Sequence, residues 1–596
     1  MGVRGLILSV VSLVFLGAGA GYYFLNQANR IPIPVPEVQA VVFDPYGDPL
    51  LSGYKLYRDA LVAKDWITLE NLAMLRDDYV AYRAAQTLTQ QVGFPPLQLL
   101  SYYRRLLELR IDDPLDRTER PALLANYAFV AESAGSYDEA IRAYREALPL
   151  PQAVEGLKRL QTDPYTLSNT FLQARRYGDA LETLGDRPAP SVEAPAHLNL
   201  GEYEAALEAY ERWLADAPGS PEAIRGKAWA LFYLGRDDEA DAIFAERLET
   251  SPNDTSALYG RALIARRAED IDAAVGFLRE SGESDHLWLA TGYLEARNRY
   301  GEAIAIYLQL ARTGGTLSDD AAYRAYTLAT RLNDETTANE AKALIPANTF
   351  FAFKLGEPLT LSSSTQLSTV SVPALRVSNL LTQVDDHEAA VGELLFALRR
   401  STNPSEKMSL AQALQTLGEY RQSWRVAEQL RSQGFTDSRL WKLSYPRAYG
   451  VEVLSEAARH ELEPALLWAI MRQESAFYPK AISTSNAKGL MQVVPSTWDW
   501  LADLQEETPG DPFNPETNIR YGAFYLRWLL DYLEGDTELV MVSYNRGQGY
   551  IKRLFESEYV AGSKDELYRE IDTLEAREYL QRVMVNYEIY KQLYEN

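Results

Sequence analysis

The sequence predicts an all-α protein, a curved superhelix of helical repeats followed by a mainly α-helical domain, and three observations support this fold class. From about residue 46 to 345 the chain reads as one helix after another, and a helical pattern recurs there. Between 346 and 450 the recurrence fades, but helical periodicity persists, as in HEAAVGELLFALRR. After a break, the region 451–596 opens with a strongly apolar helical stretch.

The composition allows several domains and excludes several functions. The chain has 596 residues, of which 47% are apolar and 24% charged, as in an ordinary globular protein. It contains no cysteine, which excludes disulfides, thiolate metal sites, cysteine nucleophiles and a lipidated cysteine. A net charge of −24 argues against general binding of nucleic acid. The four histidines are far apart and no H-E-x-x-H occurs, which argues against a zinc enzyme. No metal or cofactor is expected.

The N-terminal residues 1–30 predict export and a membrane segment. Arg4 precedes the 21 uncharged residues from Gly5 to Leu25, which have about the length that spans a bilayer as a helix. A small-residue signal-peptidase motif ends at Ala20, but the apolar run continues beyond it. We therefore favour an uncleaved anchor at residues 5–25 over a cleaved signal peptide. The proline-rich residues 31–45 are expected to form a stiff spacer.

A pattern with a period of 34 residues marks the region 46–345. GEYEAALEAYERWLADAP (201–218) returns as GRDDEADAIFAERLETSP (235–252), with Tyr210 aligned with Phe244. Period and pattern resemble the tetratricopeptide repeat, in which small alanines let helices approach and an aromatic residue fills the gap between neighbours. Such an array forms either a groove for a peptide or protein partner or a scaffold for another domain, and we favour the scaffold.

A helical linker domain, 346–450, is expected to join the repeats to the last domain, 451–596. Pro446 and Gly450 break the helical pattern at this junction.

The helix that opens the last domain carries a glutamate on its apolar face. Leu467 and Ile470 precede Glu474 by seven and four residues, and these offsets share one helical face. Pro464 suits a first turn, so we expect a helix over about 465–477 with Glu474 in its last turn. The helix dipole and an apolar setting both favour the protonated carboxyl, which a general acid at neutral pH requires. The alternative is an ordinary exposed or ion-paired glutamate.

Five motifs follow one another in this domain. They are SYPRAYG…IMRQESAFYPKAIS, GLMQVVPST, DPFNPETNIRYGAFYLRWLL, SYNRGQG and EAREYLQRVMVNYEIY. In order, spacing and residue identity they closely resemble the soluble lytic transglycosylases, which are lysozyme-like enzymes that cut the glycan of bacterial cell walls. The match covers about 150 residues, and the helical superhelix before it looks like that of the ring-shaped members of the family.

The resemblance implies one catalytic residue and a set of substrate contacts. The catalytic residue is Glu474, and the substrate-binding residues are Ser475, Gly489, Met491, Gln492, Tyr544, Asn545, Glu575 and Tyr579. The family's largely structural segment is matched by Asp511, Pro512, Asn518, Ile519 and Gly522.

Each of these residues has an expected role by the same resemblance. The hydroxyl of Ser475 positions the acid and the sugar, and Gly489 lets the backbone approach the sugar closely. Met491 and Gln492 line the saccharide cleft, although core packing is the alternative for Met491. The Tyr544 hydroxyl reaches toward the reacting centre.

The pattern continues on a later helix. Glu575 and Tyr579 stand four residues apart on one helix face, and the family places both at the cleft wall.

Two departures affect the cleft rim. Asn486 stands where the family usually has glycine, and asparagine tolerates the left-handed backbone better than most residues. Arg546 follows the Tyr-Asn pair where the family has alanine, which puts the glycan contacts there in doubt.

The mechanism follows from the resemblance and from the number of carboxylates. Most glycosidases use two, and this domain offers one well-placed acid, Glu474. By resemblance, the N-acetyl group of the substrate supports the cationic centre and its C6 hydroxyl replaces water. Glu474 then acts first as acid and next as base at the β-1,4 bond between N-acetylmuramic acid and N-acetylglucosamine, giving a 1,6-anhydro product for cell-wall turnover.

Two other interpretations stay open. A lysozyme-type hydrolase would need a second carboxylate, for which Asp511 and Glu575 are the candidates. A non-catalytic repeat scaffold would only bind peptidoglycan.

The expected partners are peptidoglycan glycan strands, a cell-wall protein on the repeat groove, and the membrane through residues 5–25. The expected location is the periplasmic side of the cell envelope.

Overall fold

The computed structural model describes residues 45–111, 119–361, 366–556, 571 and 574–594. The chain divides into two units, residues 1–49 and 50–596. The predicted anchor at residues 5–25, the cleavage motif and most of the spacer lie outside the described residues. Among the helices within the described ranges, none combines the length and the apolar character needed to cross a membrane.

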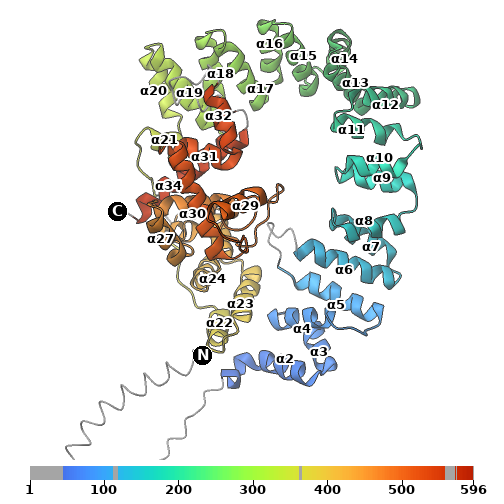
Figure 1. Ribbon diagram of the computed structural model, residues 1–596, viewed down its shortest axis with the longest axis vertical. Helices are drawn as coiled ribbons and strands as arrows, with labels where there is room; N and C mark the ends of the chain where they lie inside the picture. Colours follow the sequence, from blue (N-terminus) through green and yellow to red (C-terminus); the bar gives the residue numbers. More distant parts are fainter. Residues whose placement is uncertain (1–44, 112–118, 362–365, 557–570, 572–573, 595–596) are drawn as a thin grey trace, which may run out of the picture. The chain divides into compact units, whose positions relative to one another are not determined.

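Two short 3₁₀ helices and nineteen α-helices occupy the described part of the region predicted as repeats. They are η1 (Pro45–Gly47), η2 (Pro49–Leu51), α2 (Ser52–Ala63), α3 (Trp66–Leu75), α4 (Tyr79–Thr89), α5 (Pro96–Leu109), α6 (Glu119–Ser133), α7 (Tyr137–Glu146), α8 (Pro151–Leu160), α9 (Pro164–Gln173), α10 (Tyr177–Leu184), α11 (Pro190–Leu200), α12 (Tyr203–Asp216), α13 (Pro221–Tyr233), α14 (Asp237–Thr250), α15 (Thr255–Arg267), α16 (Ile271–Ser281), α17 (Ser284–Glu295), α18 (Tyr300–Thr313), α19 (Ser318–Arg331) and α20 (Glu335–Ala343). Consecutive helices pack against one another from α2 to α8 and again from α9 to α20, as Figure 1 shows.

The repeated aromatic residue of one helix packs against a glycine of the next. A Cβ on Gly226 of α13 would lie 2.1 Å from the ring of Tyr210 on α12. A Cβ on Gly260 of α15 would lie 2.4 Å from the ring of Phe244 on α14. Both rings are buried, so glycine at these positions allows the helices to approach closely. The two glycines are again 34 residues apart, although the sequence analysis did not single them out.

Six helices follow the repeats, and one of them packs against the start of the array. They are α21 (Phe350–Lys354), α22 (Pro373–Gln383), α23 (His387–Arg400), α24 (Pro404–Thr416), α25 (Tyr420–Ser432) and α26 (Ser438–Ser444). Helix α23 contacts α4, where Arg83 Nη1 lies 2.6 Å from Asp386 Oδ2. A Cβ on Gly392 would lie 2.3 Å from the ring of Tyr79. The contact between α4 and α23 therefore uses the same aromatic-on-glycine packing as the repeats.

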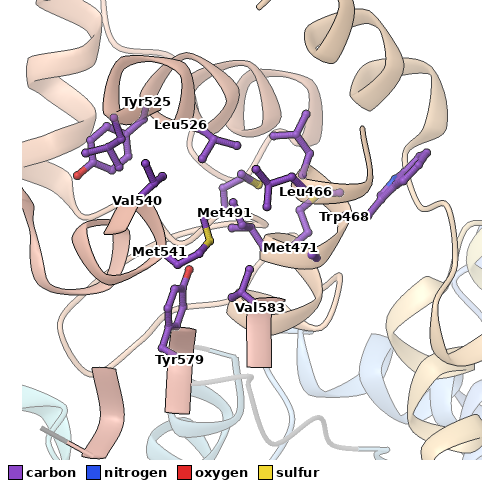
Figure 2. Packing of buried hydrophobic residues seen from close by; sticks show 14 of the residues in the cluster. Leu466, Trp468, Met471, Met491, Tyr525, Leu526, Val540, Met541, Tyr579 and Val583 are labelled. Carbon is purple, nitrogen blue, oxygen red and sulfur yellow. The ribbon is translucent and has the colours of Figure 1, made fainter. Parts of the chain in front are cut away.

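The last region has one hydrophobic core. Its described helices are α27 (Gly450–Arg459), α28 (Pro464–Ser475), α29 (Pro495–Leu504), α30 (Pro515–Tyr532), α31 (Thr537–Arg546), α32 (Gln548–Glu556) and α34 (Leu574–Tyr594). Figure 2 shows side chains from α28, α30, α31 and α34 meeting in this core. Antiparallel bridges join Lys488 to Ile482 and to Val493, in the loop between α28 and α29. The predicted boundary at Pro446 lies in the short connection between α26 and α27.

Candidate active site

Glu474 lies in the last turn of α28, as the sequence predicts. Pro464 occupies the first turn, and the helix ends at Ser475, two residues earlier than expected. The reason is the backbone after it, since Ala476 and Phe477 have φ angles of 45° and 66° and a right-handed helix cannot continue through them. The sharp stop leaves Glu474 at the C-terminal end of the helix.

Glu474 lines a cavity of about 400 Å³. Four other residues predicted to bind substrate also line it, namely Gln492, Tyr544, Asn545 and Glu575. These side chains come from α28, the loop before α29, α31 and the first turn of α34. The fold therefore brings together residues that are up to about 100 positions apart in the sequence.

Burial raises the pKa of Glu474 to about 8. The Tyr579 hydroxyl opposes this by donating a hydrogen bond of 2.6 Å to Glu474 Oε1, which stabilises the carboxylate. The negative charge of Glu575 raises the pKa further. Because loss of hydration outweighs the hydrogen bond, Glu474 holds a proton at neutral pH in a cavity that is open to a ligand.

Tyr544 and Tyr579 border this carboxyl and stay neutral. Burial and the nearby charge of Glu474 raise the pKa of both phenols well above the usual value of 10.0. The Tyr544 hydroxyl donates to the backbone oxygen of Met491 at 2.9 Å. This hydrogen bond holds the hydroxyl on the cavity wall, and its predicted reach toward the reacting centre stays a prediction.

Gln492 is fixed by its own loop. Its backbone is left-handed, with φ 48°, and Nε2 donates to the carbonyls of Ala481 at 3.1 Å and Gly489 at 2.8 Å. Both amide hydrogens are thereby used inside the loop. Oε1 is then the atom that this side chain can offer to a hydroxyl or amide of a ligand.

Ser475 and Gly489 are absent from the described cavity lining, and their predicted roles toward the sugar stay predictions. The Ser475 side chain is buried, and Oγ donates to the Leu490 carbonyl at 2.8 Å, which ties the end of α28 to the next loop. Gly489 has φ 79°, and a Cβ there would lie 2.2 Å from Asn518 Nδ2 and from the Pro512 carbonyl. Gly489 therefore allows the loop to pack closely against α30.

Met491 is part of the core. Its side chain is fully buried and packs where Gly522 of α30 has no Cβ. Figure 2 shows Met491 among the other core side chains. The Met491 side chain therefore belongs to the core, which was the alternative to a place in the saccharide cleft. Its backbone carbonyl accepts the hydrogen bond from the Tyr544 hydroxyl.

Of the two candidates for a second carboxylate, the structure brings one to the cavity. Glu575 is exposed and lines the cavity with Glu474. Asp511 does not line it, and Asp511 Oδ1 accepts the backbone N–H of Phe513 at 2.9 Å, as a turn residue does.

The two departures from the family pattern both lie at this site. Asn486 has φ 62°, so the left-handed backbone survives without glycine, as predicted. Arg546 lines the cavity, and its guanidinium carbon lies 5.2 Å from the centre of the Tyr550 ring. Arg546 therefore adds a cation to the described cavity lining, which also includes the carboxyl groups of Glu474 and Glu575.

Tyr525 lines the cavity without having been predicted from the sequence. It lies in the segment of α30 that was expected to be largely structural, yet its ring centre is 5.2 Å from that of Tyr544. No sequence signal marked it, because Tyr525 continues the apolar face of α30 and looks like any core aromatic residue.

Family models match two parts of the chain. Residues 453–566 match the "Transglycosylase SLT domain", and residues 197–267 match the "Tetratricopeptide repeat". Both resemblances drawn from the sequence are thereby confirmed.

The similar curated proteins match about a quarter of this chain. A "Membrane-bound lytic murein transglycosylase C" of Actinobacillus pleuropneumoniae is 38% identical over 160 residues, 23% of this chain and 44% of the relative. A "Putative soluble lytic murein transglycosylase" of Haemophilus influenzae is 32% identical over 157 residues, 26% of each chain. The chain thus spans less than half the length of these relatives.

Two solved structures are similar over most of their length. The 70 kDa soluble lytic transglycosylase of Escherichia coli has a TM-score of 0.52 at 18% identity, covering 92% of this chain and 97% of that one. The lytic transglycosylase Slt of Pseudomonas aeruginosa has a TM-score of 0.56 at 18% identity, covering 91% and 97%. These similarities confirm the predicted fold class, an α-superhelix followed by a lysozyme-like domain.

Proposed function

We propose that this chain, which carries a transglycosylase SLT domain behind tetratricopeptide repeats, is a peptidoglycan lytic transglycosylase. It cleaves the β-1,4 bond between N-acetylmuramic acid and N-acetylglucosamine and releases 1,6-anhydromuropeptides. The observation that carries this proposal is a glutamic acid that is protonated at neutral pH and lines an open cavity. The pKa of Glu474, raised to about 8 by burial, suits a residue that must first give a proton and then take one.

Glu474 performs both steps in the proposed reaction. Its Oε1 accepts the Tyr579 hydrogen bond, so the second carboxyl oxygen carries the proton and gives it to the glycosidic oxygen as the C1–O4 bond breaks. The N-acetyl group of the substrate stabilises the positive charge at C1. The ionised Glu474 then removes the proton of the C6 hydroxyl while O6 bonds to C1. The carboxyl regains its proton, and no water is consumed.

The hydrolase remains the second candidate, on one observation. Glu575 lines the same cavity as Glu474 and could act as a base for water. Asp511 is not a candidate for this base, because it does not line the cavity and its carboxylate accepts a backbone hydrogen bond within a turn. A non-catalytic scaffold has little support, since a structural carboxyl would gain nothing from a raised pKa next to an open cavity.

Mass analysis of the products from purified cell-wall sacculi tests the proposal. The transglycosylase releases muropeptides that are one water lighter than lysozyme products and have no reducing muramic end. Reducing ends in the wild-type products would instead establish the hydrolase. Glu474→Gln keeps the shape but cannot move a proton, so its rate should fall by at least about 10⁴-fold, the upper end of the range for general acid–base catalysis.

The proposed location is the periplasmic side of the cell envelope, with residues 5–25 as a membrane anchor. The charge-free segment behind Arg4 supports this proposal. N-terminal sequencing of the mature protein checks it, because a chain beginning at Gly21 would contradict the anchor. A cell-wall protein on the repeat groove is proposed as a further partner, and capture by the full chain but not by a repeat-deleted chain would support it.

A further inference from the structure

Helix α34 carries two sets of side chains on opposite faces. Glu575 lines the cavity and Tyr579, one turn later, binds Glu474. Arg577 and Gln581 alternate with them. Because each residue turns an α-helix by about 100°, side chains two positions apart point in nearly opposite directions. Arg577 and Gln581 therefore face away from the cavity, and their contacts show that they face the repeat array.

The repeat array holds this second face through Asp320 of α19. Gln581 Nε2 donates to Asp320 Oδ1 at 2.8 Å, and Arg577 Nε lies 3.7 Å from the same oxygen. Asp320 and Arg577 are both only 6% exposed. At that burial an unpaired charge is costly: burial raises the pKa of Asp320 to about 7, and the Arg577 guanidinium opposes this rise by stabilising the carboxylate.

A ring from a second repeat helix completes the contact. The guanidinium carbon of Arg577 lies 4.7 Å from the ring centre of Trp288 on α17. Arg577 Nε and Asp320 Oδ1 are too far apart for a direct hydrogen bond, so the ion pair alone does not orient the guanidinium. The contact with the Trp288 ring orients it.

The residues that hold α34 are themselves anchored in the array. Arg324, one turn after Asp320 on α19, places Nε 3.2 Å from both carboxylate oxygens of Glu295 on α17. Tyr307 of α18 donates to Glu295 Oε1 at 2.7 Å. Glu295 is only 4% exposed. Three repeat helices are thus locked together directly behind Asp320, and they form a rigid support for α34.

We propose that Asp320 and Trp288 of the repeat array are positioning residues for catalysis. By holding Arg577 and Gln581 they fix the rotation of α34 about its axis and so place the Tyr579 hydroxyl on Glu474. The array is then more than a scaffold, because it completes the wall of the active site from behind. This inference rests on the proposed role of Glu474.

The test compares the full chain with Asp320→Ala, Tyr579→Phe and the double variant on purified sacculi. Asp320→Ala should lower kcat about tenfold or more, since small misplacements in an active site cost up to about 10²-fold, and should leave KM within about twofold. The alkaline limb of its pH profile should shift upward, as in Tyr579→Phe, because Glu474 loses the hydrogen bond that lowers its pKa. The double variant should be no slower than Tyr579→Phe alone.

A matched control removes an Asp–Arg pair elsewhere in the array. Asp241 of α14 binds Arg261 of α15, with Oδ1 and Nε 2.8 Å apart, and neither residue touches α34 in the structure described. Asp241→Ala should leave kcat unchanged. If Asp320→Ala fails to fold, Asp320→Asn, which keeps the acceptor for Gln581, and Trp288→Leu should show the same pH shift.

Three results would overturn the proposal. They are an unchanged kcat in Asp320→Ala, losses that multiply in the double variant, and an equal loss in Asp241→Ala. Cleavage is measured as glycan released by either chemistry. Hydrolytic products would therefore contradict the transglycosylase and leave the positioning test intact.

Discussion

Tyr579 and Glu474, 105 residues apart in the chain, are joined by a hydrogen bond of 2.6 Å from the phenol to the carboxyl. The bond favours the ionised carboxyl, while the surrounding protein favours the neutral one, and burial is the larger effect. Burial raises the pKa of the candidate acid to about 8, and the hydrogen bond from Tyr579 keeps it from rising further.

Glu474→Gln should stabilise the protein, and the gain should grow with pH. The pKa of Glu474 rises from 4.5 to about 8 on folding, so the folded state binds the proton more tightly. The wild type therefore loses stability as pH rises from about 4.5 to about 8, and glutamine cannot ionise. Thermal melts should agree at pH 4 and diverge by pH 8, by about 2–4 °C for each kcal/mol in a domain of 150–250 residues. A constant difference across this range would contradict the raised pKa.

Tyr579→Phe should move the alkaline limb of the pH–rate profile upward by about one to two pH units. Removing a hydrogen bond to a charged group loses about 1.5–3 kcal/mol, and one unit of pKa is about 1.4 kcal/mol. Tyr544→Phe is the matched control, because the Tyr544 hydroxyl donates to the Met491 carbonyl and not to Glu474. That variant should lower the rate without moving the limb. Identical profiles for all three proteins would show that Tyr579 does not tune the acid.

Gly226→Ala should destabilise the repeat array by about 1–3 kcal/mol through overpacking. The new methyl group would lie 2.1 Å from the buried ring of Tyr210. Gly276 of α16 is the control, because it is also helical and a Cβ there meets nothing within 4 Å. Gly276→Ala should be neutral or stabilise by about 0.5–1 kcal/mol through helix propensity. Chemical denaturation measures both, and equal effects would mean that the repeat packing is wrong.

Gly489→Ala should damage the active site through the fold. Its Cβ would lie 2.2 Å from the Pro512 carbonyl, and its φ of 79° is unfavourable for any other residue. We expect a loss of stability of about 2 kcal/mol or more and a lower kcat with unchanged product mass. Asn486→Gly, at φ 62° in the same loop, should change stability by less than about 1 kcal/mol. Full stability of Gly489→Ala would contradict the structural role.

The sequence alone determined the all-α class, the repeats and the position of the candidate acid, Glu474, at the end of its helix. These follow from local patterns: a period of 34 residues, the apolar faces of the helices, and a glutamate among apolar residues at a helix end. Helical periodicity states which face of an element is buried. It cannot state what covers that face, because the covering residues come from distant parts of the chain.

Only the tertiary structure decided how the candidate site residues divide between cavity and core. Met491 packs against Gly522 of α30, and Gly489 lies against Asn518 of the same helix. Tyr525, also on α30, lines the cavity. From the sequence alone, Met491, Gly489 and Tyr525 could each lie either in the core or at the cavity. Their roles differ because close packing between distant elements, and not local preference, fixes which side chains meet a ligand.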